Sequence, residues 1–228
     1  MIFTTASEVM DAYCAHSRKN RANKESKIMS NVVSKSGRVI EDPPLARFLF
    51  SDTRLAWVWT IVRVLIGLSW LDAASHKLSS PGWMETGEAL KGFWVGALAI
   101  PDGGKSKIAF DWYRQFLQGM VDNGSYVWFA KLIAIGELLI GVGLIVGAFV
   151  GIAAFFAALM NWNFIMAGAA STNGLLLVGA IALILAWKVA GYYGADYVLL
   201  RYLGTPWRSR KLEEVGIPSG QVTSPVKA

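Results

Sequence analysis

Two charged residues lie inside long apolar segments, and their side chains have the chemistry for an ion pair or for proton transfer. Arg63 is about nine positions into the segment that begins at Leu55, and Glu137 is about eleven positions into the segment that begins at Val127. In antiparallel membrane helices, with a rise of about 1.5 Å per residue, these positions have similar depths. An isolated charge there costs at least ~2.5 kcal/mol, so we expect the two side chains to pair inside a helix bundle. The pair either fixes the helix register or makes Glu137 a proton carrier beside a bound redox ligand.

Amide, indole and amine side chains fall in one half of the same segments. Asn161 and Asn163 belong to the stretch MNWNFIMAG, Trp70 and Lys77 lie near the end of the first segment, and Lys131 lies near the start of the second. An asparagine amide in a membrane helix either bonds a ligand carbonyl or bonds a neighbouring helix. A tryptophan at this level either flanks a flat ring or anchors the headgroup region. We expect these five side chains to line a ligand cavity, with the two lysines favouring anions at its mouth.

A run of apolar residues must position these groups. Residues 127–170 contain only two charged side chains. As one helix the run would be about 66 Å long, roughly twice the thickness of the hydrocarbon layer. We therefore expect a hairpin of two membrane helices that turns between Gly147 and Gly151, where glycine lets the backbone reverse.

The predicted fold class is all-α, an integral membrane four-helix bundle with short interfacial helices between the first and second spans. Residues 83–99 and 108–120 mix aromatic with charged side chains, which is typical of helices that lie in the membrane interface. A polar, disordered tail is expected over residues 1–54 and a basic tail over residues 194–228. The four predicted spans cover residues 55–75, 127–146, 152–168 and 175–193.

The basic residues outside the spans predict the orientation. Residues 1–54 hold nine lysines or arginines, whereas residues 76–126 and 194–228 hold five each. Positively charged flanks resist translocation, so we expect a multi-pass protein of the cell inner membrane with both termini in the cytoplasm.

Composition excludes several classes of protein. With 54% hydrophobic and 17% charged residues, the 228-residue chain is too apolar for an ordinary soluble domain. Its net charge of +6 resides mostly in the tails beside the spans, so we expect the lipid bilayer as partner and no nucleic acid. The start is polar, which predicts no cleavable secretory signal, and Met1 and Met29 are both plausible starts.

The sequence supports no bound metal centre. Cys14 is the only cysteine, which excludes a disulfide within the chain and a cysteine-held iron–sulfur cluster. His16 and His76 are the only histidines, so two-histidine haem ligation inside the bilayer is also excluded.

Several motifs together indicate a family. They are the Arg63, Gly67 and Trp70 pattern followed by Lys77, KGFW at residues 91–94, DWYRQFL at residues 111–117, the block WFAKLIAIGELLIGVGLIVGAFVGIAAFFAALMNWNFIMAG, and the ASTN that follows it. With these motifs, residues 54–207 resemble the DoxX family of small four-helix membrane proteins, related to the DoxD subunit of thiosulfate:quinone oxidoreductase. The resemblance implies electron transfer from a sulfur compound to membrane quinone, with quinone as a dissociable acceptor.

Two functions stay open at this point. The first is quinone-linked oxidation of thiosulfate or a related sulfur compound, with Glu137 and Arg63 as catalytic residues. The second is a non-catalytic membrane anchor or scaffold for soluble redox enzymes, which the lack of cofactor ligands in the sequence favours. Both predict quinone or a second membrane or soluble redox subunit as a partner. A small transporter ranks lowest, because the paired broken spans expected of one are missing.

Overall fold

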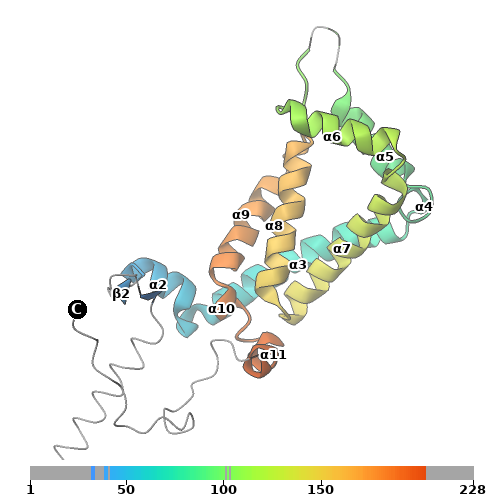
Figure 1. The fold of residues 1–228 in the computed structure, drawn as a ribbon. Helices are drawn as coiled ribbons and strands as arrows, with labels where there is room; N and C mark the ends of the chain where they lie inside the picture. The colour runs from blue at the N-terminus through green and yellow to red at the C-terminus, as the bar shows by residue number, and fades with distance from the viewer. Residues whose placement is uncertain (1–31, 34–38, 41, 101, 103, 204–228) are drawn as a thin grey trace, which may run out of the picture. The chain divides into compact units, whose positions relative to one another are not determined.

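A computed structural model describes residues 32–33, 39–40, 42–100, 102 and 104–203 (Figure 1). The chain separates into two units, Met1–Pro44 with Arg208–Ala228, and Leu45–Trp207. In the first unit, strand β1 (Val32–Val33) pairs antiparallel with β2 (Val39–Ile40). Most of the predicted tails, residues 1–31 and 204–228, lie outside the described residues.

The described part of the second unit is helical, so the all-α prediction is confirmed at that level. Thr53–Leu78 and Tyr126–Val146 are long and apolar enough to cross a membrane. The helices are α2 (Pro44–Ser51), η1 (Thr53–Leu55), α3 (Ala56–Leu78), α4 (Pro81–Met84), α5 (Glu88–Leu98), α6 (Asp111–Asp122), α7 (Tyr126–Val146), α8 (Val150–Met166), α9 (Asn173–Leu185), α10 (Trp187–Ala190) and α11 (Asp196–Tyr202).

Helix α2 was not expected, because the sequence analysis placed residues 44–54 in a disordered tail. Pro44 begins the helix, a position where proline is tolerated because its missing N–H has no partner within the helix anyway. The Trp59 indole N–H donates to the Leu49 carbonyl at 2.8 Å, so the end of α2 is joined to α3. Helix α11 likewise lies in the predicted basic tail.

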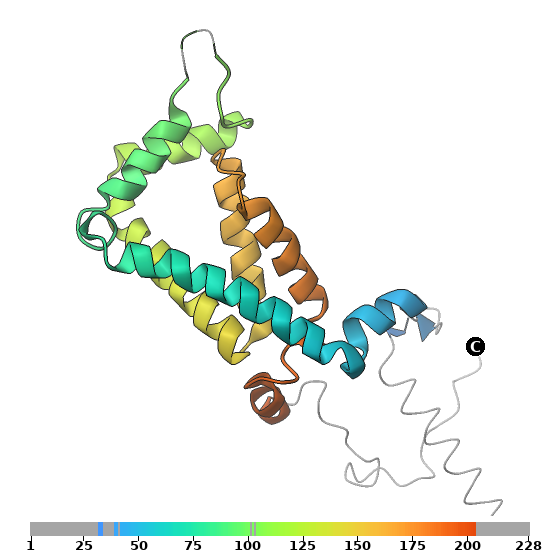
Figure 2. The same ribbon diagram turned by 180° about the vertical axis from the view of Figure 1, so that it is seen from behind.

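Helices α3 and α7 pack side by side through two glycines, and α8 and α9 form a second pair (Figures 1 and 2). A Cβ atom added at Gly67 would lie 2.8 Å from Cγ1 of Ile145, and one added at Gly141 would lie 2.7 Å from Cδ2 of Leu71. Only glycine permits this approach, so the two residues fix where α3 crosses α7.

The predicted hairpin turn is confirmed. Helix α7 ends at Val146, and Gly147 and Phe149 both adopt the left-handed conformation, with φ of 72° and 50°. Helix α8 then begins at Val150. The glycine at position 147 supplies the chain reversal without a steric penalty.

The helices expose many large apolar side chains, although they also bury an apolar core. Only 28% of the apolar stretch in Thr53–Leu78 and 39% of that in Tyr126–Val146 are buried. Arg63, Glu137 and Asn161 are buried, whereas large apolar side chains at helical spacing are exposed. This pattern is typical of helices whose outer faces meet lipid. The exposed side chains include Trp57, Ile61, Leu65 and Leu68 on α3, Leu132, Ile135, Leu139 and Val142 on α7, Ile152, Phe155, Phe156 and Leu159 on α8, and Leu175, Val178, Ile181 and Leu185 on α9.

Candidate functional site

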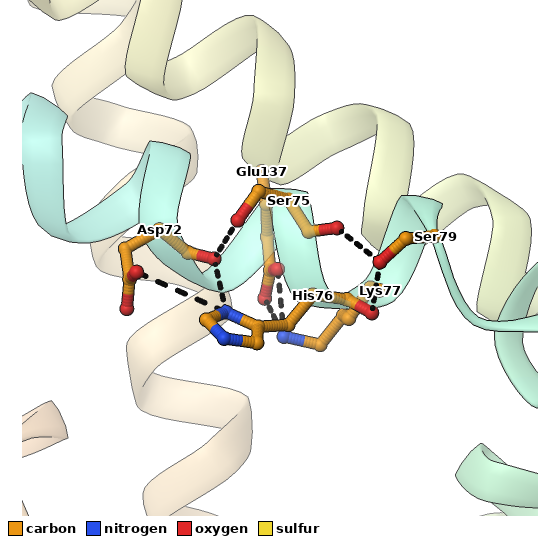
Figure 3. Close-up of polar contacts among 6 residues, drawn as sticks. All are labelled: Asp72, Ser75, His76, Lys77, Ser79 and Glu137. Atoms are coloured by element: carbon orange, nitrogen blue, oxygen red, sulfur yellow. Dashed lines mark hydrogen bonds and ion pairs between the residues drawn. The ribbon is translucent and has the colours of Figure 1, made fainter.

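A buried ion pair joins the end of α3 to the middle of α7. The Lys77 amine donates to both carboxylate oxygens of Glu137, with Nζ 2.9 Å from Oε1 and 2.7 Å from Oε2 (Figure 3). The Glu137 side chain is 1% exposed and that of Lys77 is 17% exposed. The ammonium also lies 5.1 Å from the centre of the Trp83 ring, a cation–π contact. Lys77 therefore compensates the charge of Glu137 and lies between that carboxylate and the outside of the bundle.

The predicted pairing of Arg63 with Glu137 is wrong. The Arg63 guanidinium packs against Gly147, where an added Cβ would lie 2.8 Å from Cζ. Gly147 is ten residues beyond Glu137, which is about 15 Å along a helix. The sequence estimate assumed that the two helices begin at matching levels, but α3 continues to Leu78 and brings Lys77 to the carboxylate instead.

Arg63 binds the end of the hairpin rather than the site. Its Nη1 donates to the Leu144 and Ile145 carbonyls, the latter at 2.7 Å, and its Nη2 donates to the Tyr193 carbonyl at 2.9 Å. The first two carbonyls belong to the last turn of α7, where they have no partner within the helix and where the helix dipole favours a cation. Arg63 is therefore a structural residue, and its predicted catalytic role is not supported by this position.

Asp196 completes the same end of the bundle, and the sequence analysis missed it. Its buried carboxylate accepts hydrogen bonds from the amides of Phe149 and Val150, the latter at 2.9 Å, and so caps α8. Burial raises the pKa of Asp196, while these two hydrogen bonds and the nearby Arg63 act in the opposite direction. The signal in the sequence was an acidic residue two positions after Gly194, directly after the fourth predicted span.

A cavity of about 610 Å³ lies beside the ion pair at the opposite end of α3 from Arg63. Four of the predicted site residues line it, namely Trp70, Lys77, Glu137 and Asn161. The structure thus brings together residues from α3, α7 and α8 that are up to 91 positions apart in the chain. The sequence placed Asp72 at the same level and allowed Asn173 as a secondary contact, but it gave no sign of the other lining side chains, which include Trp83, Phe93, Phe164 and Leu176.

Two of the side chains that line this cavity hold three buried polar atoms without a hydrogen-bond partner. They are Nε1 of Trp70 and both Nδ2 and Oδ1 of Asn161. Among the described residues, the remaining buried side-chain atom without a partner is Nε of Arg63. An unpaired buried polar group costs about 1–3 kcal/mol, so a polar guest that pairs with these atoms would be bound more favourably.

Asn163 and Lys131 do not line the cavity, although both were predicted to bind ligand. The Asn163 amide donates to the Leu159 carbonyl at 2.8 Å, and its Oδ1 accepts from the Tyr113 hydroxyl at 3.3 Å. That hydroxyl also donates to the Asn163 carbonyl at 3.0 Å, and burial raises the pKa of Tyr113, which keeps the donor protonated. Asn163 therefore ties α8 to α6. Lys131 is half-buried on α7.

The charges at the cavity do not favour anions. Among the described residues that line the cavity, Lys77 is the one cation, and Glu137 neutralises it, while Asp72 adds a second carboxylate. The expected bias of Lys77 and Lys131 toward anions is therefore not what this arrangement provides. Over the residues that the structure describes, no cluster of three or more histidine, cysteine, aspartate or glutamate side chains is placed to hold a metal ion.

Comparisons of this chain with known proteins add no further assignment. No family model matches the chain, and neither a curated protein nor a solved structure matches it significantly. The resemblance to the DoxX family therefore stays a prediction from the residues themselves.

Proposed function

We propose that this chain is a DoxX-like, multi-pass protein of the inner membrane that binds a quinone in the cavity beside Lys77 and Glu137. In this role it serves the oxidation of thiosulfate or a related sulfur compound. The observation that carries the proposal is the set of three unpaired polar atoms of Trp70 and Asn161 in the wall of an aromatic cavity. Such atoms are expected where a polar guest completes the hydrogen bonding.

The exposed apolar faces support the membrane part of the proposal. Helices α3 and α7 supply two crossings by length and composition. Helix α8 has 17 residues, or about 26 Å, and α9 continued by α10 extends from Asn173 to Ala190, or about 27 Å. These lengths approach the ~30 Å hydrocarbon layer, so α8 and the α9–α10 pair are the proposed third and fourth crossings. The distribution of lysine and arginine then favours both termini in the cytoplasm.

A quinone headgroup matches the cavity in size and chemistry. A volume of about 610 Å³ lies within the usual range of ligand pockets. Phe93, Phe164 and Trp83 supply aromatic surfaces against which a flat ring can stack. The Trp70 indole N–H and the Asn161 amide N–H are free to donate to a ring carbonyl.

The Lys77–Glu137 pair suits the proton chemistry of quinone reduction. A quinone that accepts two electrons also takes up two protons, and two thiosulfate anions supply those electrons when they join through a new sulfur–sulfur bond. Lys77 is the outer and Glu137 the inner member of the pair, so protons from outside pass to the ring through them. The carboxylates disfavour a dianion in the cavity, so we assign the sulfur oxidation to a place outside it, on a partner subunit.

Quinone binding by the purified full-length chain in lipid nanodiscs tests the proposal. We expect calorimetric titration with decylubiquinone to give saturable binding that weakens at least tenfold in Lys77→Met and in Glu137→Gln. Lys131→Met is the matched control, because it removes a half-buried lysine of α7 outside the cavity. Absence of binding to the wild type, or equal loss in Lys131→Met, would contradict the proposal.

A membrane anchor is the second candidate, and the surface of α6 favours it. Phe110, Trp112 and Phe116 are each about half exposed, beside the charged Asp111 and Arg114. The mixture of aromatic and charged side chains that predicts a position in the membrane interface also suits contact with a soluble protein at that level. If wild-type protein copurifies with soluble redox enzymes and binds no decylubiquinone, and if Trp112→Ala releases those enzymes, the anchor replaces the quinone proposal.

A further inference from the structure

The unpaired atoms of the cavity wall are of two kinds. Oδ1 of Asn161 can only accept a hydrogen bond, whereas Nδ2 of Asn161 and Nε1 of Trp70 can only donate. Exchanging the oxygen and nitrogen of the amide leaves this count unchanged, since both atoms lack partners. The wall therefore requires a guest that both accepts and donates.

Glu137 adds acceptor capacity to the same wall. Its two oxygens accept from Lys77, yet a carboxylate offers about four lone-pair positions, so it can accept from a guest as well. The carboxylate of Asp72 also lines the cavity. The two carboxylates therefore offer more acceptor positions than the Lys77 ammonium fills.

The oxidised and reduced forms of a quinone differ in this respect. A ring carbonyl only accepts, so an oxidised ring leaves Oδ1 of Asn161 without a donor. A ring hydroxyl accepts from the indole or amide N–H and donates its own hydrogen to Oδ1. Only the reduced form satisfies all three atoms of Trp70 and Asn161.

We propose that this cavity binds the hydroxyl-bearing quinol more tightly than the carbonyl-bearing quinone, and that Asn161 determines the preference. The inference rests on the proposed function and adds the preferred form of its ligand. Leaving one buried acceptor unpaired is expected to weaken binding about tenfold. A tenfold preference for the reduced form raises the midpoint potential of the bound two-electron couple by about 30 mV. The site therefore drives reduction of its ligand and releases the product slowly.

Titrations of both redox forms under anaerobic conditions test this inference. We expect the full-length chain in nanodiscs to bind decylubiquinol about tenfold more tightly than decylubiquinone. Asn161→Leu, which keeps the branched outline but removes both polar atoms, should bring the two dissociation constants within about twofold of each other. Asn163→Ala is the matched control, because its amide is paired with Leu159 and Tyr113 outside the cavity, and it should keep the preference.

Trp70→Phe separates binding of the ring from the preference for its reduced form, and it guards against a folding artefact. Both redox forms can accept from the indole N–H, so its loss should weaken both by a similar factor and leave their ratio unchanged. Equal binding of the two forms by the wild type, or tighter binding of the quinone, would overturn the inference and leave the proposed function intact. Binding of neither form would overturn both, and a preference that persists in Asn161→Leu would remove Asn161 from its role.

Discussion

Replacement of Asn161 by leucine should stabilise the empty protein, although core substitutions usually destabilise. The Asn161 side chain is fully buried and neither of its polar atoms has a partner. Each unpaired atom costs about 1–3 kcal/mol, and leucine has the same branched outline. Poorer fit of the two larger terminal groups offsets part of that gain. We expect a net increase of about 1–2 kcal/mol in the free energy of unfolding.

Unfolding in detergent measures this directly. The purified wild type and variant are titrated from a mild detergent into sodium dodecyl sulfate, and helix content is followed by circular dichroism. Saturating decylubiquinol should reverse the order, because a ligand at 100 times its dissociation constant stabilises the wild type by about 2.7 kcal/mol and the variant less. A residue that lowers stability and is needed for binding is the expected signature of a functional site.

The same substitution two residues along the chain provides the control. Asn163→Leu removes an amide that bonds the Leu159 carbonyl and the Tyr113 hydroxyl, so it should destabilise by about 1–2 kcal/mol. A rise in the free energy of unfolding for Asn161→Leu and a fall for Asn163→Leu would support the distinction between an unpaired and a paired amide. If Asn161→Leu destabilises as much as Asn163→Leu, the amide is satisfied in the folded protein and the argument from unpaired atoms fails.

Three other perturbations have expected outcomes. Lys77→Met should lower the free energy of unfolding by about 3 kcal/mol or more, because it leaves the Glu137 carboxylate buried without a counter-charge. In the same detergent titration, the double variant Lys77→Met with Glu137→Met should recover most of that loss. Burial raises the pKa of Asp196, so the neutral carboxyl is favoured in the folded state. Its contribution to stability is therefore full below pH ~3.8 and is lost as pH rises through the raised pKa. Asp196→Asn should flatten that part of the plot of unfolding free energy against pH, and an unchanged slope would contradict the prediction. Gly67→Ala should destabilise the protein by about 1–3 kcal/mol, because the added Cβ would meet Ile145. Gly92→Ala on α5 is the control and should be neutral or slightly stabilising, because nothing lies within 4 Å of its added Cβ. A similar loss of stability in both variants would mean that the close approach of α3 to α7 does not cause the effect of Gly67→Ala.

The sequence predicted the positions of the helices better than it predicted the contacts between them. The helices near residues 55–75 and 127–168 followed from runs of apolar residues, and the turn at Gly147 followed from length and glycine. Because few polar groups are tolerated inside apolar helices, polar character selected Trp70, Lys77, Glu137 and Asn161, which line one cavity. It also selected Arg63, Lys131 and Asn163, which do not line it. The predicted partner of Glu137 was wrong. The carboxylate pairs with Lys77, which lies 14 residues after Arg63 on the same helix, because the register of α3 against α7 differs from the expected one.

The missed features have a common physical cause. Helix α2 is joined to α3 by the hydrogen bond from the Trp59 indole to the Leu49 carbonyl. The cap on α8 comes from Asp196, 46 residues after Val150. Neither contact has a local pattern, because each is formed only when the helices pack. The same holds for Asn163, whose residue type matches that of Asn161 but whose partner, Tyr113, lies on a different helix.

Arg63 and Glu137, which were predicted to pair, have separate roles at opposite ends of the bundle. Arg63 binds carbonyls at the end of α7 and faces Asp196, which caps α8, so this cluster satisfies the polar backbone at the hairpin turn. Glu137 is paired with Lys77 and borders a cavity whose wall is left unsatisfied. Among the described residues, the hairpin end leaves one buried side-chain atom unpaired, Nε of Arg63, whereas Trp70 and Asn161 at the cavity hold three. That contrast, rather than the presence of charge in an apolar helix, is the argument for locating ligand binding at Trp70 and Asn161.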